Sequence, residues 1–222
     1  DKEEEIINVI GIEKFEQDDL FVLTATKEGQ IKRSNLSDYA VQRYSKPIKT
    51  MNVKDGDEMI FAELVSPNKE LLLTSYLSYT LRFNLDEIPV TGVKTGGVKG
   101  INLKDDDQLV SINILESGEE QEVFVVTQRG AVKRMSVREI ESSNRAKRGV
   151  VILKELKANP HRILKVMVVE KTDSVTLITD KQIQETINVS DLSKADRYSN
   201  GSLRIDVAND GDIISVKVDK KE

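Results

Sequence analysis

One pattern recurs four times along this chain of 222 residues. Each copy opens with a short apolar, β-branched run, continues through a turn, and ends in a run where apolar and basic residues alternate. Aligned on Thr26, Tyr76, Thr127 and Thr179, successive copies are spaced 50, 51 and 52 residues apart. So regular a period indicates an array of repeats, in which each unit buries its apolar face against its neighbours.

Each copy predicts about four β-strands and no helix of any length. The first repeat shows the plan: apolar runs at 21–25 and 58–65 lie on either side of a closing motif at 36–39 and an Asp-Gly hairpin signal at 55–56. One four-stranded blade per ~50 residues is typical of propeller-like folds. We therefore predict an all-β domain spanning 1–222, with repeats starting near residues 20, 70, 122 and 174. Residues 1–19 are predicted to hold a strand of an incomplete blade, or one that closes the array.

Composition bears on where in the cell the protein is expected to be. The chain has no cysteine, no apolar stretch near the ~20 residues that a membrane helix needs, and an acidic beginning unlike a signal peptide. These features predict a soluble intracellular protein.

The net charge of −5 hides a segregated pattern. Residues 1–20 carry eight acidic and two basic side chains, and residues 101–122 carry seven and one. Residues 27–49 carry instead six basic and two acidic side chains, and residues 127–150 carry seven and two. Charges more than a Debye length of ~8 Å apart scarcely interact, so a fold that gathers the basic blocks on one edge would attract phosphate.

The alternating runs suggest where such an edge lies. Neighbouring residues of a strand face opposite ways, so the aliphatic partners of Lys32, Arg82 and Lys133 would face the packing and the basic side chains would face outward. This interpretation predicts a recurrent basic rim in three of the four repeats. The fourth repeat has Glu185 and Thr186 at the corresponding place and is expected to contribute least.

The combination of an apolar strand, a glycine turn, Lys32-Arg33, the motif at 36–39 and the Gly-rich run at 96–103 resembles the C-terminal domain of bacterial type IIA topoisomerase A subunits. The resemblance covers about residues 6–218. It implies a β-pinwheel, a propeller-like disc whose blades exchange strands, and a basic outer edge that binds and bends duplex DNA. The Gln-Arg-Arg-Gly-Gly-Lys-Gly signature of DNA gyrase is absent, which favours topoisomerase IV; the gyrase wrapping domain is the alternative.

The resemblance also implies a role and partners. The domain would be non-catalytic and would present DNA to the cleavage core of an ATP-hydrolysing type II topoisomerase that decatenates and relaxes DNA in chromosome segregation. The ATPase B subunit, together with the rest of the A subunit, would complete a heterotetramer, cytoplasmic and associated with the nucleoid. ATP and Mg²⁺ would bind to those other parts, and this domain would hold no cofactor.

The candidate DNA contacts are basic residues of the alternating strands and of the loops beside them. The strand set is Lys32, Arg33, Arg82, Lys133 and Arg134. The loop set is Arg43, Lys46, Lys49, Lys94, Lys99, Arg129, Arg145, Lys147 and Arg148.

No catalytic or metal-binding set is predicted. The run Asp105-Asp106-Asp107 aligns with Asp55-Gly56-Asp57 and is explained by a shared turn, and His161, the one histidine, is expected in a surface turn. Two other classes stay open. A protein-interaction propeller is disfavoured by the absence of tryptophan and of a WD signature. A carboxylate glycosidase is disfavoured by an aromatic content of 5%.

Overall fold

The computed structural model describes residues 4–41, 45–104 and 106–221, and it contains four antiparallel sheets in chain order. The first sheet comprises β3 (Met59–Val65), β1 (Phe21–Thr26), β2 (Gln30–Asn35) and β6 (Val98–Lys99). The second comprises β7 (Leu109–Glu116), β4 (Lys69–Ser75), β5 (Tyr79–Asn84) and β10 (Val150–Val151). The third comprises β11 (Ile163–Val169), β8 (Glu122–Thr127), β9 (Ala131–Ser136) and β14 (Ser202–Leu203). The fourth has three strands, β15 (Ile213–Asp219), β12 (Ser174–Thr179) and β13 (Gln184–Asn188).

Helices are short. The predicted closing motif forms a 3₁₀ turn in every repeat, at η1 (Leu36–Tyr39), η2 (Leu85–Glu87), η3 (Val137–Glu139) and η4 (Val189–Asp191). The single α-helix of the described residues is α1 (Val207–Asp210). The all-β, repeat-based prediction is confirmed. Within the described ranges, no helix has the length and apolar character to cross a membrane.

One of the two edge strands in each of the first three sheets comes from the following repeat. β6 pairs with β2, β10 with β5, and β14 with β9, although the two partners are far apart in the chain. This exchange gives the fold its pinwheel character. We call the segments that bring the chain back onto the previous sheet the crossing loops; they comprise residues 89–100, 141–152 and 193–204.

Glycine makes the exchange possible at two positions. Gly149 and Gly201 have φ of +82° and +73° just before β10 and β14. A Cβ atom would lie 2.2 Å from the carbonyl oxygen of Thr80 at the first position, and 2.1 Å from that of Val132 at the second. A residue with a side chain could not bring the backbone so close to the preceding sheet.

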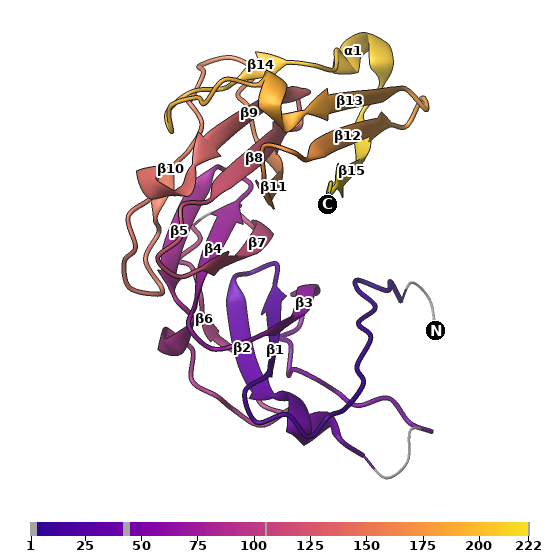
Figure 1. The fold of residues 1–222 in the computed structure, drawn as a ribbon, viewed down its shortest axis with the longest axis vertical. Helices are drawn as coiled ribbons and strands as arrows, with labels where there is room; N and C mark the ends of the chain where they lie inside the picture. Colours follow the sequence, from indigo (N-terminus) through magenta and orange to yellow (C-terminus); the bar gives the residue numbers. More distant parts are fainter. Residues whose placement is uncertain (1–3, 42–44, 105, 222) are drawn as a thin grey trace.

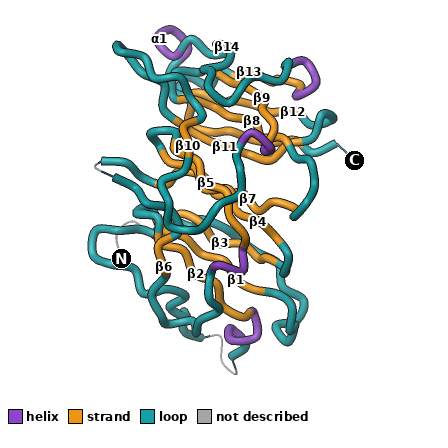
Figure 2. The backbone as a smooth tube through the Cα atoms, turned by 90° about the vertical axis from the view of Figure 1, so that its left-hand side faces the viewer, coloured by secondary structure: helices purple, strands orange, loops and turns teal. Residues whose placement is uncertain are grey.

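The sheets stand side by side in an open arc (Figure 1). β3, β7, β11 and β15 lie on the concave side, where both ends of the chain are found, whereas β6, β10 and β14 lie on the convex side. Figure 2 views the arc from that convex side, across which the crossing loops run. We call this side, formed by the three exchanged strands and the crossing loops, the outer rim.

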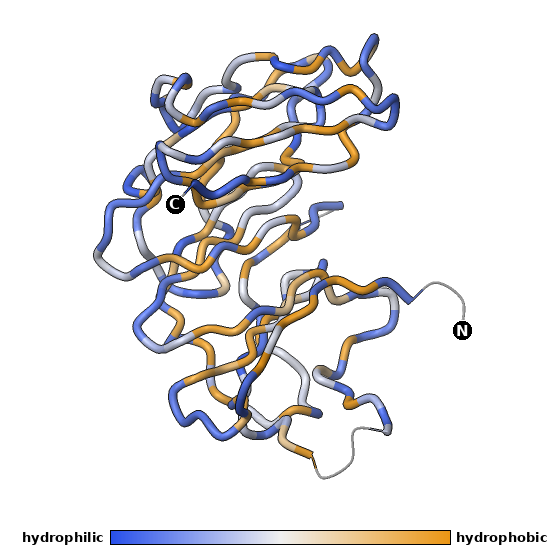
Figure 3. Tube along the Cα trace, turned by 45° about the vertical axis from the view of Figure 1, so that its right-hand side comes forward, coloured by the Kyte–Doolittle hydropathy of each residue, from blue (hydrophilic) through white to orange (hydrophobic). Residues whose placement is uncertain are grey.

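The central strands of the second sheet are covered on both faces by neighbouring sheets. Leu71, Leu72 and Leu73 are consecutive in β4 and none has any exposed surface. Apolar residues accordingly follow the strands, and hydrophilic residues gather in the turns (Figure 3). Central strands covered in this way read as continuous apolar runs, because neither face meets water.

The structure corrects the alignment of the second repeat by one residue. The backbones of Arg33, Arg82 and Arg134 make equivalent bridges to the crossing loops, so Leu81 occupies the position of the two lysines and Ser75 matches Thr26. The turn before β5 places Ser78 at φ +72°, where the first and third repeats have Gly29 and Gly130 and the fourth has Gln182. A shift of one residue exchanges the two faces of a strand.

The strand expected within residues 1–19 is not observed in residues 4–19. Part of this segment lies beside β3, where the Asn8 amide nitrogen donates a 2.8 Å hydrogen bond to the Ala62 carbonyl.

Candidate nucleic-acid interface

The basic residues of the central strands are buried, which contradicts their predicted outward orientation. Lys32 and Lys133 are 2% exposed, and Arg33 and Arg134 are 7% exposed. Arg82 is half-buried. The prediction failed because it assumed that one face of β2, β5 and β9 meets solvent, whereas neighbouring sheets and crossing loops cover both faces.

The two buried lysines hold crossing loops in place. Lys133 in β9 donates hydrogen bonds to the carbonyl oxygens of Ile152 (2.5 Å), Arg197 (2.7 Å), Ser199 (2.9 Å) and Asp196 (3.3 Å). The pKa of Lys133 is lowered to about 8, chiefly by burial; the charge of Glu139 opposes the shift, that of Arg197 adds to it, and that of Asp196 opposes it. An ammonium group has three N–H donors, and here neutral backbone carbonyls receive them all.

Lys32 has the same arrangement two blades earlier. Its ammonium group donates to the hydroxyl of Ser34 (2.5 Å) and to the carbonyl oxygens of Thr50 (2.9 Å) and Val93 (3.1 Å). Burial lowers its pKa, and the charge of Asp38 opposes the shift. Both lysines therefore join a central strand to the next repeat rather than to a ligand.

The arginines beside them are paired with carboxylates. Arg33 contacts Asp86 at 3.0 Å, across the boundary between the first and second repeats. Arg82 contacts Glu70 at 2.5 Å within the second sheet, and both side chains are largely buried. Buried guanidinium groups paired in this way have little charge left for a phosphate.

Arg134 belongs to a small network. It lies 3.4 Å from Glu122, whose carboxylate is also 2.7 Å from the ammonium group of Lys194 in the third crossing loop. The hydrogen bond from Lys194 to Glu122 raises the pKa of that lysine. The five strand residues predicted to contact DNA thus stabilise the blades, and we remove them from the candidate interface.

The predicted loop residues are more accessible to solvent than the strand residues. Lys46, Lys49, Lys94, Lys99 and Lys147 are exposed, and Arg129, Arg145 and Arg148 are half-buried. Arg43 lies outside the described residues. Lys94, Lys99, Arg145, Lys147 and Arg148 all belong to crossing loops, so the fold brings this part of the predicted set to the outer rim.

Arg145 and Arg197 occupy equivalent places in successive crossing loops. Arg145 donates to the carbonyl of Lys99 at 2.6 Å, and Arg197 donates to that of Val151 at 2.5 Å. Their backbone N–H groups bond to Glu87 and Glu139 of the preceding 3₁₀ turns, at 2.7 and 2.5 Å. The second and third crossing loops are therefore each attached to the exchanged strand before them, which connects the outer rim from β6 through β10 to the third crossing loop.

Residues 21–66, 69–116 and 121–170, three successive repeats, match the family described as "DNA gyrase C-terminal domain, beta-propeller". The chain belongs to the DNA gyrase C-terminal domain family.

Relatives of this gyrase-family domain are named as A subunits of DNA topoisomerase 4. The protein of Bacillus subtilis (strain 168) is 40% identical over 216 residues, and that of Staphylococcus epidermidis is 34% identical over 216 residues. Both alignments cover 97% of this chain, but they cover 26% and 27% of the relatives. The chain thus spans about a quarter of the length of the curated relatives it matches.

Solved structures agree. The "Crystal structure of the C-terminal domain of DNA topoisomerase IV" superposes with a TM-score of 0.92 at 44% identity, covering 98% of this chain and 67% of that one. The "Structure of DNA gyrase A C-terminal domain" gives a TM-score of 0.77 at 22% identity over 90% of this chain and 66% of that one, a likeness of fold. The resemblance inferred from the sequence, including its preference for topoisomerase IV over gyrase, is confirmed.

Sequence reasoning missed several cations of the gyrase-family rim. Lys194 and Arg204 are exposed and Arg197 is half-buried, all in the third crossing loop. The fourth repeat was expected to contribute least because it has Glu185 and Thr186 in place of basic residues. Its crossing loop nevertheless carries these cations, because β14 at the end of that loop pairs with β9 of the third sheet. The 52-residue spacing between Arg145 and Arg197 was the signal that could have found the position.

Three polar residues of the domain have structural roles. Asp57 and Asp107 accept equivalent 2.9 Å hydrogen bonds from the backbone N–H groups of Glu28 and Leu77, which confirms the shared turn. The prediction that His161 lies in a surface turn is wrong: the residue is buried, and its ring contacts the Thr127 hydroxyl at 3.1 Å. Burial lowers the pKa of this histidine, and the charge of Arg129 lowers it further.

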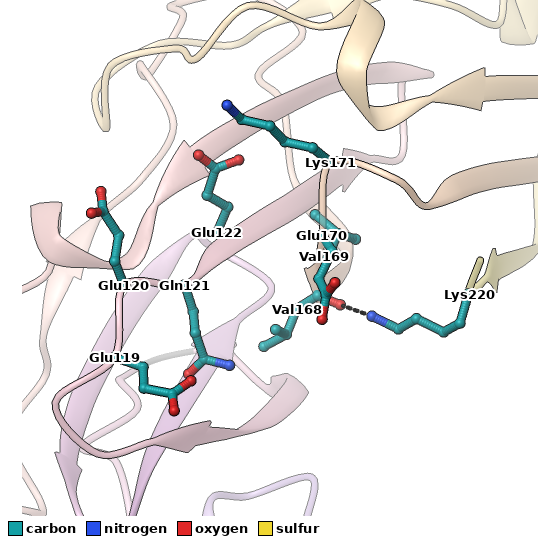
Figure 4. A pocket seen from close by; sticks show the side chains of 9 residues that line it. All are labelled: Glu119, Glu120, Gln121, Glu122, Val168, Val169, Glu170, Lys171 and Lys220. Atoms are coloured by element: carbon teal, nitrogen blue, oxygen red, sulfur yellow. Dashed lines mark hydrogen bonds between the residues drawn. The ribbon is translucent and has the colours of Figure 1, made fainter. Parts of the chain in front are cut away.

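A groove of about 330 Å³ is unsuited to phosphate. Four glutamates contribute to its wall, at positions 119, 120, 122 and 170, together with Lys171 and Lys220 (Figure 4). It lies where β8 begins and β11 ends. Its acidic lining would repel a nucleic-acid backbone, so this groove is excluded from the candidate interface.

Proposed function

We propose that this domain binds duplex DNA along its outer rim, without sequence preference, as the C-terminal domain of a topoisomerase IV A subunit. The observation that carries the proposal is the recurrence of exposed cations in all three crossing loops, among them Lys94, Lys147 and Arg204. Contacts of this kind displace condensed counterions and read no bases.

The convex shape of the rim supports a second step. A duplex that follows the arc past β6, β10 and β14 must bend, and smooth bending of 20–30 base pairs by 40–90° costs on the order of 1–6 kcal/mol. Cations spread over three blades would offset that cost by contacts that a straight duplex cannot make together. The domain would therefore bend the DNA that it presents to the enzyme core.

The wider role rests on the relatives. As part of a topoisomerase IV, the domain would be non-catalytic and would assist ATP-dependent decatenation and relaxation, which an ATPase B subunit would carry out with the rest of the A subunit. The complex would act in the cytoplasm, at the nucleoid. None of these functions requires a cofactor in this domain.

The test is a mobility shift with linear duplex at several salt concentrations. We expect micromolar or tighter binding at low salt, with log Kd rising steeply against log salt, by about 0.9 for each phosphate neutralised. A double charge reversal on the rim, Lys94→Glu with Lys147→Glu, should weaken binding at least tenfold. Neither lysine side chain makes a hydrogen bond or ion pair to the described residues, so folding should be unaffected.

The matched control reverses two exposed lysines of the concave side, Lys165→Glu in β11 and Lys217→Glu in β15. Each double variant changes the net charge from −5 to −9, because every reversal subtracts two. Equal losses in the two double variants would show that total charge, not the rim, governs binding. Absence of any shift at low salt would favour a protein-docking role instead.

A further inference from the structure

A notch opens on the outer rim where the second and third blades meet. It encloses about 240 Å³ beside β10, at the start of β5. Its polar walls come from three repeats: Ser78, Tyr79, Arg148, Glu155, Arg162 and Tyr198. Tyr198 is 50% exposed and belongs to the third crossing loop, so its ring forms the solvent side of the notch.

The guanidinium group of Arg148 is held flat by stacking. Its Cζ atom lies 3.8 Å from the centre of the Tyr79 ring. Stacking uses the face of the guanidinium plane and leaves the N–H groups at its edge available. The Arg148 side chain makes no hydrogen bond or ion pair with any described residue, and its Nε atom is buried without a partner.

The neighbouring arginines differ in this respect. Arg162 is held by Glu155 through two hydrogen bonds of 3.0 and 3.1 Å, which cancels its charge inside the notch. Arg145 and Arg197 donate to backbone carbonyls. Arg148 is thus a fixed and unused donor in a concave site, and the excess charge of that site is positive.

An anion with two acceptor oxygens in one plane fits this arrangement. A phosphodiester presents such a pair, and guanidinium groups bind it through two parallel hydrogen bonds. The hydroxyl of Ser78 makes no hydrogen bond to the described residues, and the exposed ring of Tyr198 offers an apolar surface for a deoxyribose.

We propose that this notch seats one phosphodiester of the bound duplex, gripped by Arg148 and flanked by Tyr198. The inference rests on the proposed function, because it assumes that DNA runs along the outer rim. It adds that the rim has a preformed contact point between the second and third blades, where the backbone of the duplex is held in register. Elsewhere the exposed lysines act only as mobile charges.

The decisive substitution is Arg148→Lys, which keeps the charge but removes the planar fork and the stack. We expect it to weaken duplex binding about tenfold, nearly as much as Arg148→Gln, and to lower the salt dependence by about one phosphate. Tyr79→Leu should have a similar effect, whereas Tyr79→Phe keeps the stack and should bind normally. The matched control is Arg138→Lys in η3, since Arg138 is exposed, lies outside the outer rim and has no aromatic partner among the described residues; this variant should bind as the unmodified domain does.

A second measurement follows the Arg148 Nε–H resonance by NMR. Addition of a duplex oligonucleotide should shift it, whereas inorganic phosphate at the same phosphate concentration should not. A shift with inorganic phosphate alone would assign the notch to a free anion and overturn the DNA contact. Thermal unfolding of each variant shows whether the fold is intact.

The outcomes separate the two proposals. If the unmodified domain fails to bind duplex at low salt, the proposed function itself is wrong. If it binds and Arg148→Lys binds equally well, Arg148 acts only as a charge and the notch proposal alone is overturned.

Discussion

The ammonium nitrogen of Lys133 lies 2.9 Å from the carbonyl oxygen of Ser199, 66 residues further along the chain. This single contact joins the central strand of the third sheet to the crossing loop of the fourth repeat. The same loop carries Lys194, Arg197 and Tyr198, which reach the outer rim. A basic residue that the sequence assigned to DNA therefore supports the surface on which DNA is proposed to bind.

Replacing Lys133 by methionine tests this role. The variant removes the donor from the carbonyls of Ile152, Arg197 and Ser199, and it should lose about 2–3 kcal/mol of unfolding free energy. Urea unfolding at pH 7 measures the loss. Lys165→Met, on an exposed site of β11, is the control and should stay within about 0.5 kcal/mol of the unmodified domain. Equal stability of the two variants would contradict the role assigned to Lys133.

The pH dependence of that difference has a definite sign. The pKa of Lys133 is about 8 in the folded domain, against 10.5 for an unperturbed lysine, so between these values the unfolded chain binds more protons. The unfolding free energy contributed by Lys133 must then rise with pH across that window, by on the order of 3 kcal/mol in all. Denaturant unfolding of both proteins from pH 7 to 10.5 should show the advantage of the unmodified domain over Lys133→Met growing. A constant or shrinking advantage would mean that the folded domain does not disfavour the charge.

Gly149→Ala tests the close approach of the exchanged strand. The new Cβ would lie 2.2 Å from the carbonyl oxygen of Thr80, in addition to the strain of a positive φ. We expect a loss of more than about 3 kcal/mol. Gly118→Ala is the matched control, since Gly118 has φ +79° with no atom near its would-be Cβ; its loss should be about 1 kcal/mol. Similar losses in thermal unfolding at both sites would show that β10 can move aside.

The buried pair of Arg82 and Glu70 predicts strong coupling. Removing one partner, by Arg82→Gln or Glu70→Gln, leaves an uncompensated charge in the second sheet and should cost about 3–5 kcal/mol. The double variant should lose much less than the sum of the two. A double-mutant cycle by urea unfolding measures this coupling, and additive losses would show that the ion pair contributes little.

Much of the fold could be predicted from local patterns. The period near 50 residues, the apolar runs and the 3₁₀ motif such as Leu36–Tyr39 are written into neighbouring residues, because strand propensity and turn geometry act over short stretches of chain. The loop cations Lys94 and Lys147 were also found from sequence, since charged side chains in glycine-rich loops are rarely buried.

The tertiary structure alone decided which basic residues face solvent. Alternation shows that Lys32 and its neighbours Ile31 and Arg33 point to opposite faces of a strand, but not whether either face meets water. Stacked blades and strands donated by the next repeat cover both faces of β2, and the chain that covers Lys32 includes Val93, 61 residues away. Burial at that position is a property of contacts between distant segments, which no local pattern encodes.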